Sequence, residues 1–406
     1  MNTDRIKIIN KEGFELSTSI DFPNHQKPKQ FVLFAHCFTC TSQLNAVRNI
    51  GQALNNKGIA VVRFDFTGLG KSGGNFANSH FEANVDDLVV VNDYITMHYQ
   101  APALLIGHSL GGAAAIVAAS KLENIKAVVT IGTPADIQHV TKHFAGQTKK
   151  LATDEEARVV IGGRKFTISG EFIKGFNQHD LPATIENLRK PILIMHSPVD
   201  EIVSISNAHE IYQKAKHPKS FVSLDNANHL LTKNEDSAYA GELIGSWASR
   251  YIDLKPFETP NPNKHQLVAH LNLKEDNFTT YINTKNHGII ADEPKSVGGY
   301  DFGMSPFELV SAGLAACTGM TLKLYAERKK WDLREVYTYV NHSKEMIDGE
   351  SKDVFAKSIE LVGSLDPKQK ERLRIIAAKC PVHKTLQQSS TIKTEISGES
   401  VNNHLK

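Results

Sequence analysis

Cysteine is scarce in this sequence, with four residues among 406. So few cysteines in so long a chain exclude a disulfide-based scaffold. An excess of one charge is also missing, because 46 lysines and arginines face 44 aspartates and glutamates. The balance gives no electrostatic reason to expect a nucleic acid, an anionic membrane or a polyacidic partner.

Long apolar runs are missing as well. The first eleven residues are polar and charged, unlike a secretory signal, and no uninterrupted run approaches the roughly 18 apolar residues of a membrane span. These absences predict a cytoplasmic protein whose thiols stay reduced, so that each cysteine serves packing or chemistry.

The sequence does have enough length for two or three domains and one clear break. Residues 255–265 hold Pro256, Pro260 and Pro262, which block helix and central strand and stiffen a linker. We therefore expect a first domain at residues 1–254 and a second at 266–406.

Before the linker, short apolar runs alternate with helical segments, which predicts an α/β domain with a doubly wound, mainly parallel sheet covered on both faces. Residues 136–189 break this rhythm and indicate an insertion or cap. The expected strands are Phe31–Ala35, Ile59–Phe64, Ala103–Ile106, Ala127–Ile131 and Ile192–Met195, and the expected helices are Ser42–Asn56, Phe81–Tyr99, Leu110–Leu122, Ser206–Lys216 and Asp236–Tyr251.

After the linker, strands group around a few helices, which predicts an α+β domain. The expected strands are Leu267–Leu273, Phe278–Asn283, Glu335–Val340, Lys357–Val362 and Thr391–Ile396, and the expected helices are Pro306–Lys330 and Asp366–Lys379.

The strongest local signal is Gly107-His-Ser-Leu-Gly-Gly112, which follows a predicted strand and opens a predicted helix. A tight turn between strand and helix exposes a serine hydroxyl and sets backbone N–H groups beside it. Gly107 and Gly111 permit the close approach that such a turn requires. The pattern predicts Ser109 as a nucleophile.

An acid and a histidine follow Ser109 in the order that this arrangement requires. Asp200 comes just after the strand at 192–195, and His229 follows another short strand. His229 would take the Ser109 proton, and Asp200 would orient and stabilise the imidazolium. Asp136 and Asp225 remain rival acids.

A developing oxyanion needs two backbone N–H donors. Leu110, next to the nucleophile, supplies one, and we expect Phe38, in the loop after the strand at 31–35, to supply the other. The same loop contains Cys37-x-x-Cys40 between a strand and a helix, which is also the setting of a redox motif. We favour the structural or oxyanion role for this loop.

These residues, together with Asp65-Phe-Thr-Gly-Leu-Gly-Lys-Ser-Gly-Gly74, resemble the α/β-hydrolase family over roughly residues 1–254. The resemblance implies a serine hydrolase, foremost a carboxylesterase acting on small or medium acyl esters through an acyl-enzyme, and its relatives also include thioesterases and peptidases. Cys37 stands where many relatives carry glycine.

The second domain contains Cys317 in a helix and Cys380 at a helix end, and each alone would be a buried small apolar residue. Ser305-Pro306, Ala316-Cys317-Thr318 and Cys380-Pro-Val-His-Lys-Thr-Leu386 together resemble the OsmC/Ohr family. The resemblance implies reduction of organic hydroperoxides, in which the first thiolate attacks, the second thiol resolves the sulfenic acid, and a dithiol reductant restores both.

The second domain departs from that family in its thiol-activating residues. No arginine occurs between Tyr251 and Glu327, and Phe307 stands at the family's glutamate position. At about 100° per residue, Glu308 points away from Cys317 on a continuous helix. The substitutes considered are His383, Lys384 and Arg328. The alternative is a non-catalytic module that assembles homo-oligomers, and the sequence indicates no metal or cofactor site in either domain.

Overall fold

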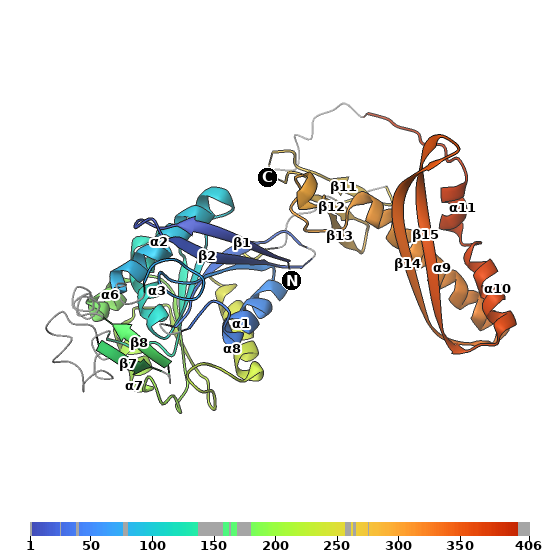
Figure 1. Cartoon of the computed structure of the whole chain (residues 1–406). Coiled ribbons are helices and arrows are strands. Elements are labelled where there is room, and N and C mark those ends of the chain that lie inside the picture. Colours follow the sequence, from blue (N-terminus) through green and yellow to red (C-terminus); the bar gives the residue numbers. More distant parts are fainter. Residues whose placement is uncertain are drawn as a thin grey trace. The chain divides into compact units, whose positions relative to one another are not determined.

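A computed structural model describes residues 2–24, 26–37, 40–75, 80–136, 157–161, 164–168, 180–255, 261–262, 265–274 and 276–396. The chain divides into two compact units, Met1–Thr259 and Pro260–Lys406 (Figure 1). Of the linker prolines, Pro262 is described, whereas Pro256 and Pro260 lie outside the described residues.

The first unit is built on an eight-stranded sheet with the order β1-β2-β4-β3-β5-β6-β9-β10. The strands from β4 to β10 run parallel, and β1 and β2 join antiparallel at one edge. The strands are β1 (Asn2–Ile9), β2 (Glu15–Phe22), β3 (Gln30–Ala35), β4 (Ile59–Phe64), β5 (Leu104–His108), β6 (Ala127–Ile131), β9 (Ile192–His196) and β10 (Lys219–Ser223). The predicted mainly parallel sheet is confirmed.

Helices cover both faces of this sheet (Figure 1). On one face α1 (Asn45–Asn56) packs against α8 (Asn234–Ala248), and on the other α2 (Phe81–His98) packs against α3 (Leu110–Lys121). The central strands read as continuous apolar runs because both of their faces are buried. Two shorter helices, α6 (Leu181–Asn187) and α7 (Ser206–Lys214), complete the layer beside α3.

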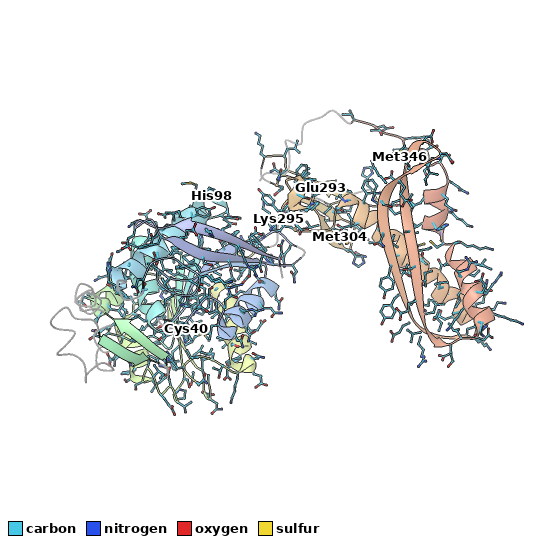
Figure 2. The ribbon with its side chains drawn as sticks, viewed as in Figure 1. Cys40, His98, Glu293, Lys295, Met304 and Met346 are labelled. Atoms are coloured by element: carbon cyan, nitrogen blue, oxygen red, sulfur yellow. A yellow bond between two sulfur atoms is a disulfide. The ribbon has the colours of Figure 1, made fainter. Side chains whose placement is uncertain are left out.

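The second unit combines a long helix with a long hairpin. Helix α9 (Pro306–Lys329) packs on β14 (Asp332–Ile347), and β14 pairs with β15 (Glu350–Ser364). The hairpin turn lies just beyond the exposed Met346 (Figure 2). The unit also holds α10 (Pro367–Ala377), α11 (Pro381–Gln387), the 3₁₀ turn Lys295–Val297 and a three-stranded sheet of β11 (Val268–His270), β12 (Thr280–Asn283) and β13 (Gly288–Ala291).

Helix α9 begins with a capping box. The Ser305 hydroxyl accepts from the Glu308 N–H while the Glu308 carboxylate accepts from the Ser305 N–H, and Pro306 occupies the first turn. Among the described residues, α9 is long and apolar enough to cross a bilayer by length and composition, and 22% of that apolar window is buried within the chain. Much of its apolar surface is therefore open.

Some predicted elements differ from the structure. Thr391–Ile396 forms no strand, and Ile392 and Ile396 are 86% and 96% exposed, so this predicted strand is wrong: its apolar side chains find no face to bury. The structure also contains β1, β2 and β13, which the sequence did not reveal, and it confirms β10 as the short strand expected before His229. Within 136–189 it describes α6 and the hairpin of β7 (Ala157–Ile161) and β8 (Arg164–Ile168), and much of the predicted cap lies outside the described residues.

Candidate active site

Ser109 lies at a sharp turn between β5 and α3. Its φ of 56° and ψ of −128° are rare for a side-chain-bearing residue, and the N–H of Ser109 donates to Ile131 O at 2.8 Å across the sheet. A Cβ at Gly107 or Gly111 would collide with the backbone of Gly112 or of His36. These two glycines are therefore required by close packing, and the strained turn holds the Ser109 hydroxyl out from the strand.

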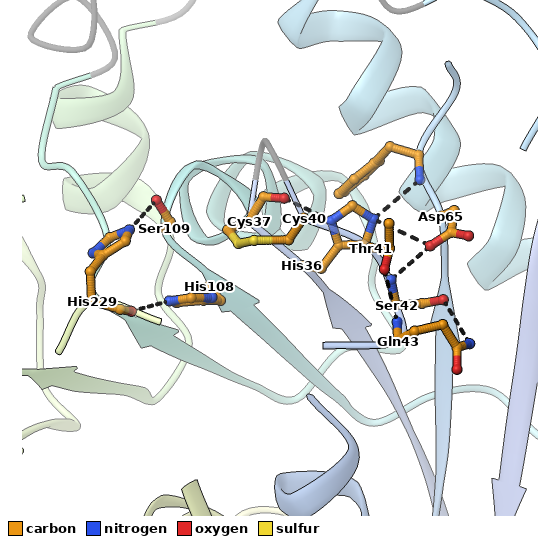
Figure 3. Close-up of a disulfide and its surroundings, with 11 residues drawn as sticks. His36, Cys37, Cys40, Thr41, Ser42, Gln43, Asp65, His108, Ser109 and His229 are labelled. Atoms are coloured by element: carbon orange, nitrogen blue, oxygen red, sulfur yellow. Dashed lines mark hydrogen bonds and ion pairs between the residues drawn. A yellow bond between two sulfur atoms is a disulfide. The ribbon is translucent and has the colours of Figure 1, made fainter. Parts of the chain in front are cut away.

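Ser109 belongs to a hydrogen-bonded chain of three side chains. The His229 Nε2 lies 2.9 Å from Ser109 Oγ, and the His229 Nδ1 lies 2.7 Å from Asp200 Oδ2. Figure 3 shows His229 meeting Ser109 from a separate segment of the chain. The structure thus brings together the three residues that the sequence singled out as nucleophile, base and acid.

Asp200 is held as a carboxylate. Burial alone would raise its pKa, but the hydrogen bond with His229 and the backbone N–H groups of Val203 and Ile202 outweigh that effect and lower it below the ordinary value. The rival Asp225 is exposed and accepts from the Ser223 hydroxyl at 2.7 Å, so its carboxylate serves the local turn. The geometry favours Asp200.

Three buried histidines hold the loops that carry these groups. The His108 Nε2–H donates to the carbonyl of His229 at 2.7 Å, and the His36 Nδ1–H donates to the carbonyl of Cys37 at 2.8 Å (Figure 3). The His196 Nε2–H donates to the carbonyl of Val203 at 2.8 Å, beside Asp200.

These three histidines are kept neutral. Burial lowers the pKa of all three, and that of His108 falls to about 3. The sequence did not reveal a role for these three histidines. The sequence signal for such a role was the position of each histidine next to an apolar strand, where burial of a charged side chain would destabilise the fold.

Cys37 and Cys40 form a disulfide with a Cα–Cα distance of 5.2 Å (Figure 3). The expectation of reduced thiols is therefore wrong for this pair: three residues of separation at the start of the loop bring the two side chains within bonding geometry. The other two cysteines, Cys317 and Cys380, are free. Phe38, the expected oxyanion donor, lies outside the described residues.

Leu110, the other expected donor, is the first residue of α3. Its N–H is among those that a helix leaves without an intrahelical partner, so it is free to face a ligand beside Ser109. A cavity of about 820 Å³ opens at this point. Its lining includes the disulfide, Ser109 and His229, with apolar and amide side chains around them (Leu44, Val199, Ile202, Leu230, Asn226 and Asn228).

The structure also brings the second domain's thiols together. Cys380 is fully buried at the N-cap of α11 and accepts from the His383 N–H at 3.3 Å, while Cys317 on α9 is half-buried and shares a hydrogen bond with it. Glu308 is occupied in the helix cap. Arg328 lies over the Tyr325 ring at 5.4 Å.

Lys357 on β15 also adjoins this pair, and the sequence argument missed it. Thr318 Oγ1 lies 3.7 Å from the Cys380 sulfur and accepts from the Lys357 ammonium at 3.0 Å. The sequence signal was a lysine at an alternate position between the apolar residues Phe355 and Ile359, so that all three side chains point to the same face of the strand.

Comparisons with known families divide the chain in the same way. Residues 26–160 match the family model described as serine aminopeptidase, S33, and residues 298–395 match the one described as OsmC-like protein. The crystal structure of the esterase domain from a Rhodothermus marinus protein is 41% identical with a TM-score of 0.52, and the match covers 62% of this chain and 99% of that one.

More distant similarities support the fold and name one further activity. A hypothetical Pseudomonas aeruginosa protein, PA2218, is 16% identical with a TM-score of 0.53 over 62% of this chain and 94% of that one, which shows the fold alone. The mitochondrial palmitoyl-protein thioesterase ABHD10 of Mus musculus is 25% identical over 44% of this chain, and that of Homo sapiens is 30% identical over 36%. The chain spans 61% and 49% of the length of these two relatives.

Proposed function

Because the chain belongs to the α/β-hydrolase family and continues into an OsmC-like domain, we propose that its first domain is a serine esterase that cleaves small or medium acyl esters. The observation that carries the proposal is the chain of contacts at 2.9 Å and 2.7 Å from Ser109 through His229 to Asp200. The esterase domain from Rhodothermus marinus, 41% identical, supports the same class.

The geometry suits a two-step acyl transfer. The Ser109 Oγ attacks the ester carbonyl while His229 Nε2 takes its proton, and Asp200 stabilises the imidazolium. The Leu110 N–H, with a second donor expected from the loop at 36–40, would stabilise the oxyanion. His229 then protonates the leaving alcohol and activates the water that releases the acid.

The test is hydrolysis of short p-nitrophenyl esters together with labelling by a fluorophosphonate. Ser109→Ala should abolish labelling and lower kcat/KM by about 10⁴-fold or more. The matched control is Ser120→Ala at the other end of α3, whose hydroxyl donates to Val117 O of its own helix. Full hydrolysis by Ser109→Ala would refute the proposal.

A thioesterase is the second candidate for the same site, favoured by the similarity to the palmitoyl-protein thioesterases ABHD10. Both reactions use the same acyl-enzyme, so the leaving group separates them. Measuring kcat/KM for an oxygen ester and a thioester of one acyl chain, over a series of chain lengths, tests the preference. An aminoacyl anilide in the same assay tests the peptidase alternative.

For the second domain we propose reduction of organic hydroperoxides by the Cys317–Cys380 pair, since the two free thiols adjoin. A thiolate attacks the hydroperoxide, the O–O bond breaks, and the alkoxide takes a proton to leave as alcohol. The second thiol condenses with the sulfenic acid, releasing water and forming a disulfide, which an external dithiol reduces. A double variant, Cys317→Ser/Cys380→Ser, that still consumes cumene hydroperoxide at the wild-type rate would exclude this activity.

We further propose that the second domain pairs with a second copy of the chain. Met320 and Leu324, one turn apart on α9, are 66% and 67% exposed, and large apolar side chains left open in this way mark an interface. Leu324→Glu in the full chain should shift the mass measured by light scattering to that of a monomer. An unchanged mass would show that this surface of α9 does not mediate self-association.

A further inference from the structure

The two sulfurs of the second domain share a cluster of polar groups drawn from different elements. Cys380 receives the backbone N–H of His383 at 3.3 Å, and Thr318 on α9 lies 3.7 Å from its sulfur. The Thr318 hydroxyl oxygen also lies 2.8 Å from Leu314 O. The single hydroxyl proton of Thr318 therefore goes to Leu314 O, and the His383 N–H is the donor to the fully buried sulfur of Cys380.

Lys357 supplies the positive charge of this cluster. Its ammonium lies 3.0 Å from Thr318 Oγ1 and 3.0 Å from Ala377 O, both neutral acceptors. Burial lowers the pKa of Lys357, and the sulfurs of Cys380 and Cys317 oppose this effect. A half-buried lysine held by neutral acceptors is costly unless it faces a negative charge, and the sulfurs provide one.

We propose that Lys357 is the cation that stabilises a thiolate on Cys380, in the place of the arginine that this domain lacks. The inference deepens the proposed peroxidase function by naming the residue that positions its thiolate. It rests on that function only for the identity of the substrate, an organic hydroperoxide. Lys357 acts across Thr318, whose oxygen accepts from the ammonium and whose hydroxyl lies beside the sulfur.

The groups around the pair favour the negative charge on Cys380, which reverses the order of the two cysteines that the family resemblance implies. Burial alone would raise the pKa of Cys380, but the His383 N–H, Thr318, Cys317 and Lys357 together lower it. His383 also faces the cluster, and burial together with Lys357 lowers its pKa, so its imidazole is neutral there.

Two of the other charged groups near Lys357 pair with each other. The groove beside Lys357 also contains Lys370, Glu371 and Arg374 of α10, and Glu371 and Arg374 form an ion pair at 2.7 Å. Neither of these two residues is among the groups that act on the lysine or on Cys380. Lys357 is therefore the residue to change.

The experiment follows thiolate absorbance against pH in the full chain, reduced with a phosphine. A Cys37→Ser/Cys40→Ser background leaves Cys317 and Cys380 as the thiols. We expect a step below the ordinary thiol midpoint of about 8.5. Lys357→Met and Lys357→Gln should raise it by about one pH unit, and Lys357→Arg should keep it low.

The matched control is Lys352→Met, on the same strand with its side chain in the solvent, which should leave the midpoint unchanged. The glutamine variant retains hydrogen bonding without charge, so an unshifted midpoint in folded Lys357→Gln overturns the proposal. The step should vanish in Cys380→Ser and persist in Cys317→Ser, and the reverse result also overturns it. A Lys357-dependent thiolate in a protein that consumes no hydroperoxide would instead leave Lys357 assigned and reject the peroxidase function.

Discussion

The two domains prepare a nucleophile in different ways. Ser109 stays neutral until attack, when His229 takes its proton, whereas the proposed thiolate on Cys380 is already ionised by the fixed charge of Lys357. A hydroxyl needs a base at the moment of reaction because its pKa is far above neutral, but a thiol lies close enough for its surroundings to shift the equilibrium. Proton transfer from Ser109 to His229 therefore requires strict geometry between the two side chains. Stabilisation of a thiolate by the charge of Lys357 requires only that the charge lie nearby.

Removing the proton acceptor should give the largest effect. His229→Ala leaves Ser109 without a base, and we expect kcat for ester hydrolysis to fall by about 10⁵-fold. His209→Ala, an exposed histidine on α7, is the control and should retain full activity. The fall should far exceed the roughly tenfold decrease in thiolate that a one-unit midpoint shift gives Lys357→Met at neutral pH. A loss of only tenfold in His229→Ala would remove the contrast between the domains.

Removing the acid should rank next. Asp200→Asn keeps the shape of the site but no longer stabilises the imidazolium, so we expect kcat to fall by about 10⁴-fold. Asp225→Asn tests the rival acid and should change kcat by less than about twofold, because that exposed carboxylate accepts from Ser223 in the local turn. A greater loss in Asp225→Asn than in Asp200→Asn would reassign the acid.

The buried histidines predict that the first domain loses stability in acid. In the unfolded chain they take up a proton near pH 6.5, whereas the folded His108 does so only at about pH 3. The stability is fully present above the unfolded value and falls as pH drops, by roughly 1.4 kcal/mol per pH unit for each such histidine. Urea midpoints of esterase activity at neutral pH and near pH 5 measure this slope.

His108→Gln is the matched variant, since it keeps a donor toward the His229 carbonyl but does not titrate. It should make the decline with pH shallower. A slope equal to that of the wild type would show that His108 is not one of the groups responsible.

The smallest effect should come from the disulfide. Reduction of Cys37–Cys40 frees a short loop beside Ser109, and a bond that closes so few residues restricts the chain little. We expect a few-fold fall in kcat/KM on reduction and in Cys37→Ser/Cys40→Ser. Cys317→Ser/Cys380→Ser is the control, and an equal fall there would separate the effect from the active-site loop.

The sequence was sufficient where local chemistry is distinctive. The segment around Ser109 predicts its own turn, because a nucleophile on a strand-to-helix turn needs glycines on both sides. The central strands can be recognised in the sequence as apolar runs. The strand β1 was missed because, although Ile6 and Ile8 alternate with Arg5 and Lys7, Ile8 is the one residue of this edge strand that is buried.

Long-range partners could not be read from the sequence. Lys357 lies 39 positions from Thr318, and only packing of β15 beside α9 reveals the contact. The carbonyl of His229 as the acceptor for His108 is equally invisible, because the two residues are 121 positions apart. A sequence pattern indicates which side chains are buried, whereas the hydrogen-bond partner of a buried polar group depends on the tertiary structure.

The bond from His108 to the backbone of His229 has one more consequence. The imidazole of His229 is fixed at its two nitrogens by Ser109 and Asp200, and its main chain is fixed at the carbonyl. The His229 side chain therefore loses its rotational freedom when the chain folds, not when an ester binds. The activation entropy of the acylation step should accordingly contain little cost for ordering this residue.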